Sequence, residues 1–131
     1  MESRPRILLA EDHAGIRERV LRLLERQFEI VAVVSDGRAV VDAAIELEPD
    51  LVITDILMPE MDGFHAAEEL RRRGSQAKVI FLTIQQDEDY AAAALDNGGF
   101  AYVLKSRMHL DLVRAVRQAL AGHKFVSPLA V

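Results

Sequence analysis

Carboxylate, hydroxyl and ammonium side chains stand at the ends of the apolar runs in this sequence. Four such runs each end on residues that can take part in polar chemistry. These residues are Glu11 and Asp12, Asp55, Thr83 and Lys105. A single acid after a strand is most often a helix cap, a single threonine suits a strand by propensity, and a single lysine is usually solvated. Five such residues at the ends of four runs indicate a shared site.

The three acids among these residues would repel one another if they met. At ~4 Å and an effective dielectric near ~20, each close pair of carboxylates costs on the order of 4 kcal/mol. Either a raised pKa lets one acid keep its proton, or a divalent cation neutralises the group. The sequence has no cysteine and no histidines at ligand spacing, so an all-oxygen site favours Mg²⁺ or Mn²⁺. If Asp55 is the nucleophile, the Thr83 hydroxyl and the Lys105 ammonium could donate hydrogen bonds to the remaining oxygens of a phosphoryl group.

The surrounding sequence alternates short apolar runs with amphipathic segments, which predicts five strand–helix units. The expected strands are 7–10, 30–34, 51–55, 78–83 and 100–104, and the expected helices are 14–27, 38–48, 63–73, 87–97 and 107–121. The run 51–55 has the length and composition of a strand buried on both faces. Such units form a parallel sheet between helices, and ligands bind beyond the carboxyl ends of its strands. Periodicity alone fits a Rossmann-like strand order equally well.

Length and composition limit the class of protein. The chain has 131 residues, half of them hydrophobic, which suits one domain with a sizeable core. Its net charge of −5 argues against direct nucleic-acid binding by this domain, and the absence of cysteine excludes thiolate chemistry. No signal-peptide core and no apolar run of membrane-spanning length occur, so we expect a soluble, cytoplasmic protein without membrane contact.

Four segments together resemble the receiver domain of bacterial two-component response regulators, and the resemblance covers the whole chain. They are LLAEDH at 8–13, DILMPEMDG at 55–63, Thr83, and YVLK at 102–105. Their combination in this order and spacing is specific, although no single segment is. The resemblance implies an α/β, flavodoxin-like (βα)5 fold, a doubly wound parallel sheet with strand order 2-1-3-4-5. The C-terminal part is most similar to the LuxR/NarL-type branch.

The resemblance also implies a role for each residue of the site. A partner histidine kinase would phosphorylate Asp55, and Lys105 would contact the phosphoryl group. The ligands of Mg²⁺, or of Mn²⁺ in its place, would be Glu11, Asp12, Asp55 and the backbone carbonyl of Leu57. Thr83 would move toward the phosphoryl group and draw Tyr102 inward behind it. The protein would then be a phosphoacceptor that takes part in its own phosphorylation and dephosphorylation, not an enzyme in the usual sense.

On this interpretation residues 1–122 form a receiver domain and residues 123–131 form a C-terminal tail. The tail could begin a linker to a helix-turn-helix output domain, in which case the output is transcription control. The partners would be a histidine kinase and either that output domain or a second copy of the chain. A dimer could form through the first and last helices, or through the fourth helix and the fifth strand.

Two other functions use similar residues but fit this sequence less well. A phosphatase of the haloacid-dehalogenase type needs a second aspartate two residues after the nucleophile, and that position holds Leu57, which cannot move a proton. The chain also has little room for a substrate cap. A receiver-like binding module that is never phosphorylated would usually lose an acid, the threonine or the lysine, and this sequence retains them all.

Three local features carry their own expectations. His13 is expected to be a helix cap or a surface residue and not a metal ligand, and Asp87 is expected to cap the helix that follows it. Ser106 follows Lys105 where many receivers have a proline, often with a cis bond. A trans peptide is therefore expected at this position.

The residues around the acceptor predict slow loss of the phosphoryl group. Ile84 follows Thr83 at a position that is commonly small in receivers, and a bulky β-branched side chain there should restrict access. Leu57 and Gln85 stand where many relatives carry polar groups that position water for hydrolysis. We therefore expect slow autodephosphorylation, to be measured as the decay of the phosphorylated protein. Decay within seconds would contradict this expectation.

Overall fold

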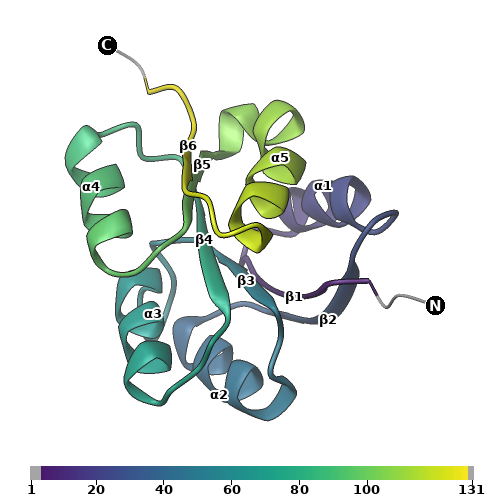
Figure 1. Cartoon of the computed structure of the whole chain (residues 1–131), viewed down its shortest axis with the longest axis vertical. Helices are drawn as coiled ribbons and strands as arrows, with labels where there is room; N and C mark the ends of the chain where they lie inside the picture. The colour runs from purple at the N-terminus through teal and green to yellow at the C-terminus, as the bar shows by residue number, and fades with distance from the viewer. Residues whose placement is uncertain (1–3, 130–131) are drawn as a thin grey trace.

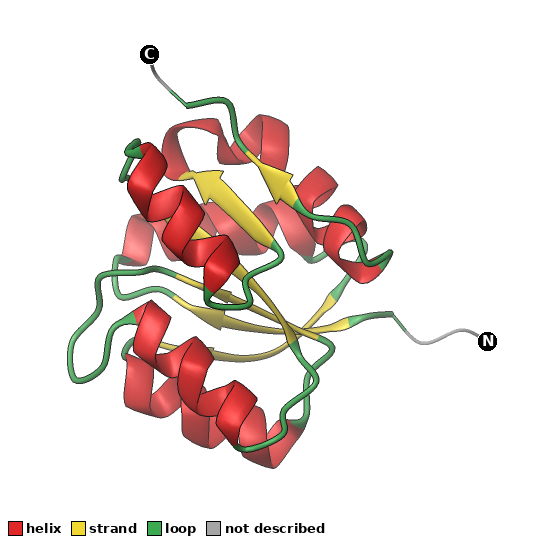
Figure 2. Cartoon of the chain, turned by 60° about the vertical axis from the view of Figure 1, so that its left-hand side comes forward, coloured by secondary structure: helices red, strands yellow, loops and turns green. Residues whose placement is uncertain are grey.

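A parallel β-sheet forms the middle layer of the protein, and helices cover both of its faces (Figure 1, Figure 2). The computed structural model describes residues 4–129. The strands are β1 (Arg6–Ala10), β2 (Glu29–Val34), β3 (Leu51–Thr54), β4 (Lys78–Thr83), β5 (Ala101–Leu104) and β6 (Phe125–Val126). Their order in the sheet is β2-β1-β3-β4-β5-β6. The predicted flavodoxin-like order 2-1-3-4-5 is confirmed, and the Rossmann-like alternative is excluded.

Five α-helices connect the strands and divide between the two faces of the sheet. They are α1 (Ala14–Leu24), α2 (Gly37–Leu47), α3 (Gly63–Arg72), α4 (Glu88–Asp96) and α5 (Met108–Leu120), with a short 3₁₀ helix, η1 (Lys105–Arg107), before α5. Helices α1 and α5 pack on one face, while α2, α3 and α4 pack on the other (Figure 1). This is the doubly wound arrangement that the alternating sequence pattern predicts.

Each of the central strands is buried on both faces. Along β1, Ile7 and Leu9 belong to the core beneath α1 and α5, whereas Leu8 and Ala10 belong to the core on the opposite face. This alternation follows from the two-residue period of a strand. It explains why the strands appear in the sequence as unbroken apolar runs and not as alternating patterns.

The first helix is shorter than its sequence pattern suggests. We predicted a helix over 14–27, but α1 ends at Leu24, after which the backbone N–H groups of Gln27 and Phe28 both donate to the Leu24 carbonyl. Phe28 is buried in the core beneath α1 and α5. The chain leaves the helix to bury this ring, because burial of a large aromatic side chain outweighs one further helical turn.

Side-chain caps begin the first four helices at the carboxyl ends of the strands. His13, Asp36, Asp62 and Asp87 each accept a hydrogen bond from a backbone N–H in the first turn of the helix that follows. The capping roles predicted for His13 and Asp87 are confirmed. Because each cap satisfies an otherwise unpaired N–H, it fixes the loop that carries the polar residues of the site.

The sheet has a sixth strand that the sequence pattern did not indicate. Strand β6 lies within the predicted tail 123–131 and pairs with β5, with Ala101 opposite Phe125 and Tyr102 opposite Val126. A strand of two residues is too short to produce a recognisable period, and two exposed polar residues, His123 and Lys124, precede it. Residues 130–131 of the predicted tail, like residues 1–3, lie outside the described part of the chain.

Two further expectations concern the backbone. No cis peptide bond occurs among residues 4–129, so the trans peptide expected between Lys105 and Ser106 is confirmed. Over the same part of the chain, no helix combines the length and the apolar character needed to cross a bilayer.

The close approach of α3 to the end of β3 depends on Gly63 and can be tested by substitution. A Cβ atom at this position would lie 2.2 Å from the backbone oxygen of Asp55, whereas at Gly15, on the exposed face of α1, the nearest atom would be at 3.4 Å. We expect Gly63→Ala to lower the free energy of unfolding by on the order of 1–3 kcal/mol through overpacking. Gly15→Ala should raise it by up to about 1 kcal/mol, because alanine favours a helix. Urea unfolding of both variants should give shifts of opposite sign, and shifts of the same sign would contradict this assignment.

Candidate functional site

Three carboxylates meet at the carboxyl edge of the sheet. Oxygen atoms of Glu11, Asp12 and Asp55 lie within 4.8 Å of one another. Glu11 and Asp12 follow β1, and Asp55 follows the neighbouring strand β3, whose end is joined to β1 by a hydrogen bond from the Asp55 N–H to the Ala10 carbonyl. Glu11 and Asp55 are buried and Asp12 is exposed. The acids that the sequence placed at strand ends are therefore brought together.

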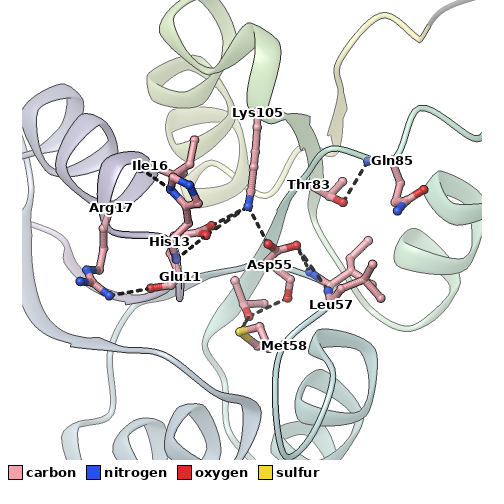
Figure 3. Close-up of polar contacts among 12 residues, drawn as sticks. Glu11, His13, Ile16, Arg17, Asp55, Leu57, Met58, Thr83, Gln85 and Lys105 are labelled. Carbon is pink, nitrogen blue, oxygen red and sulfur yellow. Dashed lines mark hydrogen bonds and ion pairs between the residues drawn. The ribbon is translucent and has the colours of Figure 1, made fainter.

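The ammonium group of Lys105 lies between two of these acids (Figure 3). Its Nζ is 2.6 Å from Oδ2 of Asp55 and 3.1 Å from Oε1 of Glu11. Burial by itself would lower the pKa of this ammonium, but the hydrogen bonds that it donates to Asp55 and Glu11, together with their negative charge, outweigh burial and raise the pKa above its usual value. Lys105 therefore stays charged, as a partly buried counter-ion to the acids.

Both carboxylate oxygens of Asp55 have fixed partners. Oδ2 contacts Lys105, while Oδ1 accepts hydrogen bonds from the backbone N–H groups of Ile56 at 2.7 Å and Leu57 at 3.4 Å. The hydroxyl of Thr54 donates to the backbone oxygen of Asp55 at 2.9 Å. Sequence reasoning missed Thr54, and the signal available for it was a hydroxyl in an apolar strand directly before the acid. These contacts orient the carboxylate before any reaction partner arrives.

The donor set fits a hard divalent cation. Three acidic side chains surround one ammonium at the sheet edge, and all the ligand atoms that they offer are oxygens. Oε2 of the buried Glu11 forms an ion pair with Nζ of Lys105 at 2.9 Å but accepts no hydrogen bond of favourable geometry. A buried carboxylate oxygen with a free lone pair is available for a metal. The Leu57 carbonyl stays a predicted ligand.

Thr83 and Tyr102 form a second polar group, linked through one residue of the β4–α4 loop. The Thr83 hydroxyl accepts a hydrogen bond from the backbone N–H of Gln85 at 3.2 Å, and the Tyr102 hydroxyl donates to the Gln85 carbonyl at 2.6 Å. Tyr102 is fully buried, so its ring already has the inward orientation. The backbone of Gln85 is thus the connection between the two residues, which no sequence pattern indicates. No hydrogen bond joins Thr83 to Asp55 or Lys105 within residues 4–129.

The two apolar residues expected at the mouth of the site extend into solvent. Leu57 is 53% exposed and Ile84 is 69% exposed. Their predicted effect on access and on hydrolysis of the phosphoryl group stays a prediction.

Comparison with known proteins identifies the family. The profile of the response regulator receiver domain matches residues 7–117. The chain belongs to the response regulator receiver family. A receiver domain of this kind has its polar residues at the carboxyl edge of the sheet, where the sequence motifs predicted them and the structure places them.

The relatives of this receiver domain are regulators of the LuxR/NarL type. The chain is 34% identical to the transcriptional regulatory protein DegU of Brevibacillus brevis over 97% of its own length and 55% of that protein. It is 32% identical to the nitrate/nitrite response regulator NarL of Escherichia coli, over 92% of its own length and 57% of that protein. The chain therefore spans little more than half the length of these relatives.

Solved structures agree with this assignment. A LuxR-family two-component response regulator from Aurantimonas sp. SI85-9A1 superposes with a TM-score of 0.90 at 33% identity, covering 96% of this chain and 91% of that one. The signal receiver domain of the putative regulator NarL from Mycobacterium tuberculosis has a TM-score of 0.88 at 26% identity, covering 93% and 100%. The fold of this receiver domain is thus that of a LuxR/NarL-type regulator.

The burial of Tyr102 predicts an unusual titration. Burial, followed by the negative charge of Asp87 and of ionised Tyr90, raises the pKa of Tyr102 to about 12 from the ordinary value of 10.0. Between these two values the folded state keeps a proton that the unfolded chain loses, so stability falls as the pH rises from 10.0 to about 12. The chain has two tyrosines, so absorbance of the Tyr90→Phe variant near ~295 nm reports Tyr102 alone.

At pH ~11 we expect about one-tenth of Tyr102 to be ionised while the protein is folded, compared with about nine-tenths for an unperturbed phenol. The Tyr102→Phe variant is the matched control, because it keeps Tyr90 and loses the hydrogen bond to Gln85. Its stability should depend less steeply on pH over the same interval. Half-ionisation of folded Tyr102 near pH ~10 would contradict the buried position.

Proposed function

We propose that Asp55 of this receiver domain accepts a phosphoryl group from a histidine kinase, and that the phosphorylated domain acts as a switch for transcription control. The observation that carries the proposal is the 2.6 Å contact between Nζ of Lys105 and Oδ2 of Asp55, beside the acids Glu11 and Asp12. A carboxylate with a charged donor on one side and backbone donors on the other is pre-oriented for nucleophilic attack.

The proposed reaction transfers the phosphoryl group from nitrogen to oxygen. A carboxylate oxygen of Asp55 forms a bond to phosphorus while the bond from phosphorus to the imidazole nitrogen of the kinase breaks. The electron pair of that bond stays on the imidazole, which takes up a proton. Lys105, already within hydrogen-bond distance of Asp55, offsets the negative charge that arrives with the phosphoryl oxygens. The domain is then a phosphoacceptor that contributes to its own phosphorylation and dephosphorylation.

Glu11, Asp12 and Asp55 would hold Mg²⁺, with Mn²⁺ as an alternative and the Leu57 carbonyl as a further ligand. When bound, the cation supplies positive charge that offsets the repulsion between the acids and the incoming phosphoryl oxygens. The free lone pair on Oε2 of buried Glu11 supports this assignment. His13 is not among the proposed ligands, because its Nδ1 caps α1.

The hydrogen bonds that connect Thr83, Gln85 and Tyr102 support a route by which a change at the site could alter the surface of the domain. The Thr83 hydroxyl accepts a hydrogen bond from the Gln85 N–H, so a movement of Thr83 toward a phosphoryl group would pull on this loop. The Gln85 carbonyl holds the Tyr102 hydroxyl, so a movement of this loop also acts on Tyr102. Helix α4 follows directly and buries only Ala91 and Ala94 among its described residues, so little apolar area resists its displacement.

The partners of the switch are proposed from its relatives. Several of them are named as transcriptional or DNA-binding regulators, and one structure of the RcsB regulator contains two dimers bound to DNA. We propose that the protein is cytoplasmic and that a histidine kinase acts upstream of it. Downstream we propose a helix-turn-helix output domain or a second receiver. The acidic receiver domain itself does not contact nucleic acid.

Phosphorylation by a small donor tests the proposal directly. Incubation with acetyl phosphate and Mg²⁺ should raise the intact mass by one phosphoryl group, and removal of Mg²⁺ with a chelator should prevent the increase. Asp55→Asn should abolish it, because the amide is not a nucleophile. Lys105→Ala should slow it by about 10²-fold or more, the order of effect that loss of one charge-stabilising group produces.

Asp42→Asn provides the matched control, because Asp42 is an exposed acid on α2, away from the carboxyl edge of the sheet. This variant should be phosphorylated at the native rate. Phosphorylation of Asp55→Asn at the native rate would place the acceptor elsewhere. If the native protein takes up no phosphate with Mg²⁺ present, it is instead the binding module that works through contacts alone.

A further inference from the structure

A buried polar pair lies behind β5, on the side of α5 and β6. Asp111 on α5 and Ser127, directly after β6, are 4% and 1% exposed. The Ser127 hydroxyl donates to Oδ2 of Asp111 at 2.7 Å. The same hydroxyl accepts the backbone N–H of Leu104 at 3.2 Å, and the Ser127 N–H donates to the Tyr102 carbonyl at 2.8 Å. The hydroxyl and the backbone N–H of the serine are therefore both engaged at the end of β5.

These contacts bracket Lys105 on both sides. Leu104, the residue before it, is tied to Asp111 through Ser127. Arg107, two residues after it, donates from Nε to the same Oδ2 atom of Asp111 at 2.9 Å. One carboxylate oxygen of the buried Asp111 is thus connected both to the residue before Lys105 and to the turn after it.

The junction between β5 and α5 lacks the side-chain helix cap that occurs at the start of the other four α-helices. Four helices begin with a side-chain cap at the carboxyl edge, but neither η1 nor α5 has a side-chain cap hydrogen bond. Ser106 in this turn is exposed and, unlike proline, does not restrict the backbone. The pair formed by Asp111 and Ser127 takes the place of the missing cap.

We propose that Asp111 and Ser127, the residue directly after β6, are positioning residues for Lys105. The inference rests on the proposed function, because it concerns the lysine that contacts the acceptor. A group that stabilises charge must be held within about 0.5 Å of its productive position. The long side chain of Lys105 is flexible, so its backbone anchor decides where the ammonium lies.

Lys105 and the acids of the site follow different strands. A substitution that displaces the lysine can therefore be distinguished from one that displaces the metal ligands. The acids follow β1 and β3, whereas Lys105 follows β5, whose last residue, Leu104, donates its N–H to the Ser127 hydroxyl. Loss of the pair should therefore affect the lysine and leave the metal ligands in place.

Substitution of Ser127 by alanine tests the proposal. We expect phosphorylation of Ser127→Ala by acetyl phosphate and Mg²⁺ to be about tenfold slower, the order of effect of one lost hydrogen bond to a charged group. Its dissociation constant for Mg²⁺, measured by calorimetry, should change by less than about twofold. Val126→Ala, a neighbouring change in β6 that keeps both polar residues, should leave the rate and the Mg²⁺ affinity at native values.

A double-mutant cycle separates positioning from a general structural effect. If Ser127 acts through the lysine, Ser127→Ala should slow the Lys105→Ala variant no further. A second tenfold loss in that background would overturn the proposal, as would a native rate in the single variant. If Ser127→Ala does not fold, Asp111→Asn replaces it in the same double-mutant cycle. This substitution keeps the shape of the side chain and removes its charge.

The ¹³C chemical shift of Lys105 Cε reports the surroundings of the lysine without requiring phosphorylation. It therefore tests the positioning role separately from the proposed function. Failure of the native protein to take up phosphate would overturn the function, but a shift of this resonance in Ser127→Ala, absent in Val126→Ala, would still support positioning. An unchanged resonance would overturn positioning even if the native protein is phosphorylated.

Discussion

A partly buried ammonium among carboxylates is the interaction on which the arrangement of this protein depends. Removal of Lys105, Glu11 and Asp55 from water is costly, and the cost is recovered only if oppositely charged groups meet at hydrogen-bond distance. Lys105 meets Asp55 at 2.6 Å and Glu11 at 3.1 Å. The groups come from β1, β3 and β5, and β4 separates β3 from β5. The lysine must therefore reach across the end of β4, which sets how accurately these strand ends must be aligned.

The parts of the site that could be predicted are those with a local signature. Glu11, Asp12 and Asp55 end apolar strands, and parallel strands bring their carboxyl ends to one edge, so their meeting followed from the order of the elements. The strand order itself required the family motifs, since periodicity fits another order equally well. The acids come together as predicted because each follows the end of a strand directly, which fixes its backbone position at the sheet edge.

The parts that could not be predicted depend on backbone groups and on tertiary packing. Gln85 was noted for its side chain, but its N–H and carbonyl connect Thr83 to Tyr102, and a backbone group has no sequence signature. The end of α1 was placed three residues late because burial of Phe28 decides it. Strand β6 has only two residues and gains its stability from β5 and from Ser127, so nothing in its own composition marks it.

Strand β6 also changes where this sheet ends. Without it, β5 would present a row of unpaired N–H and carbonyl groups to solvent, and such an edge is a template for pairing with another chain. Phe125 and Ser127 satisfy the carbonyl groups of Phe100 and Tyr102 from within the same molecule. Residue 122, where sequence reasoning ended the receiver domain, is thus an unsafe place to shorten the protein. A polypeptide cut there would leave β5 as an exposed edge strand, able to pair with a strand of another molecule.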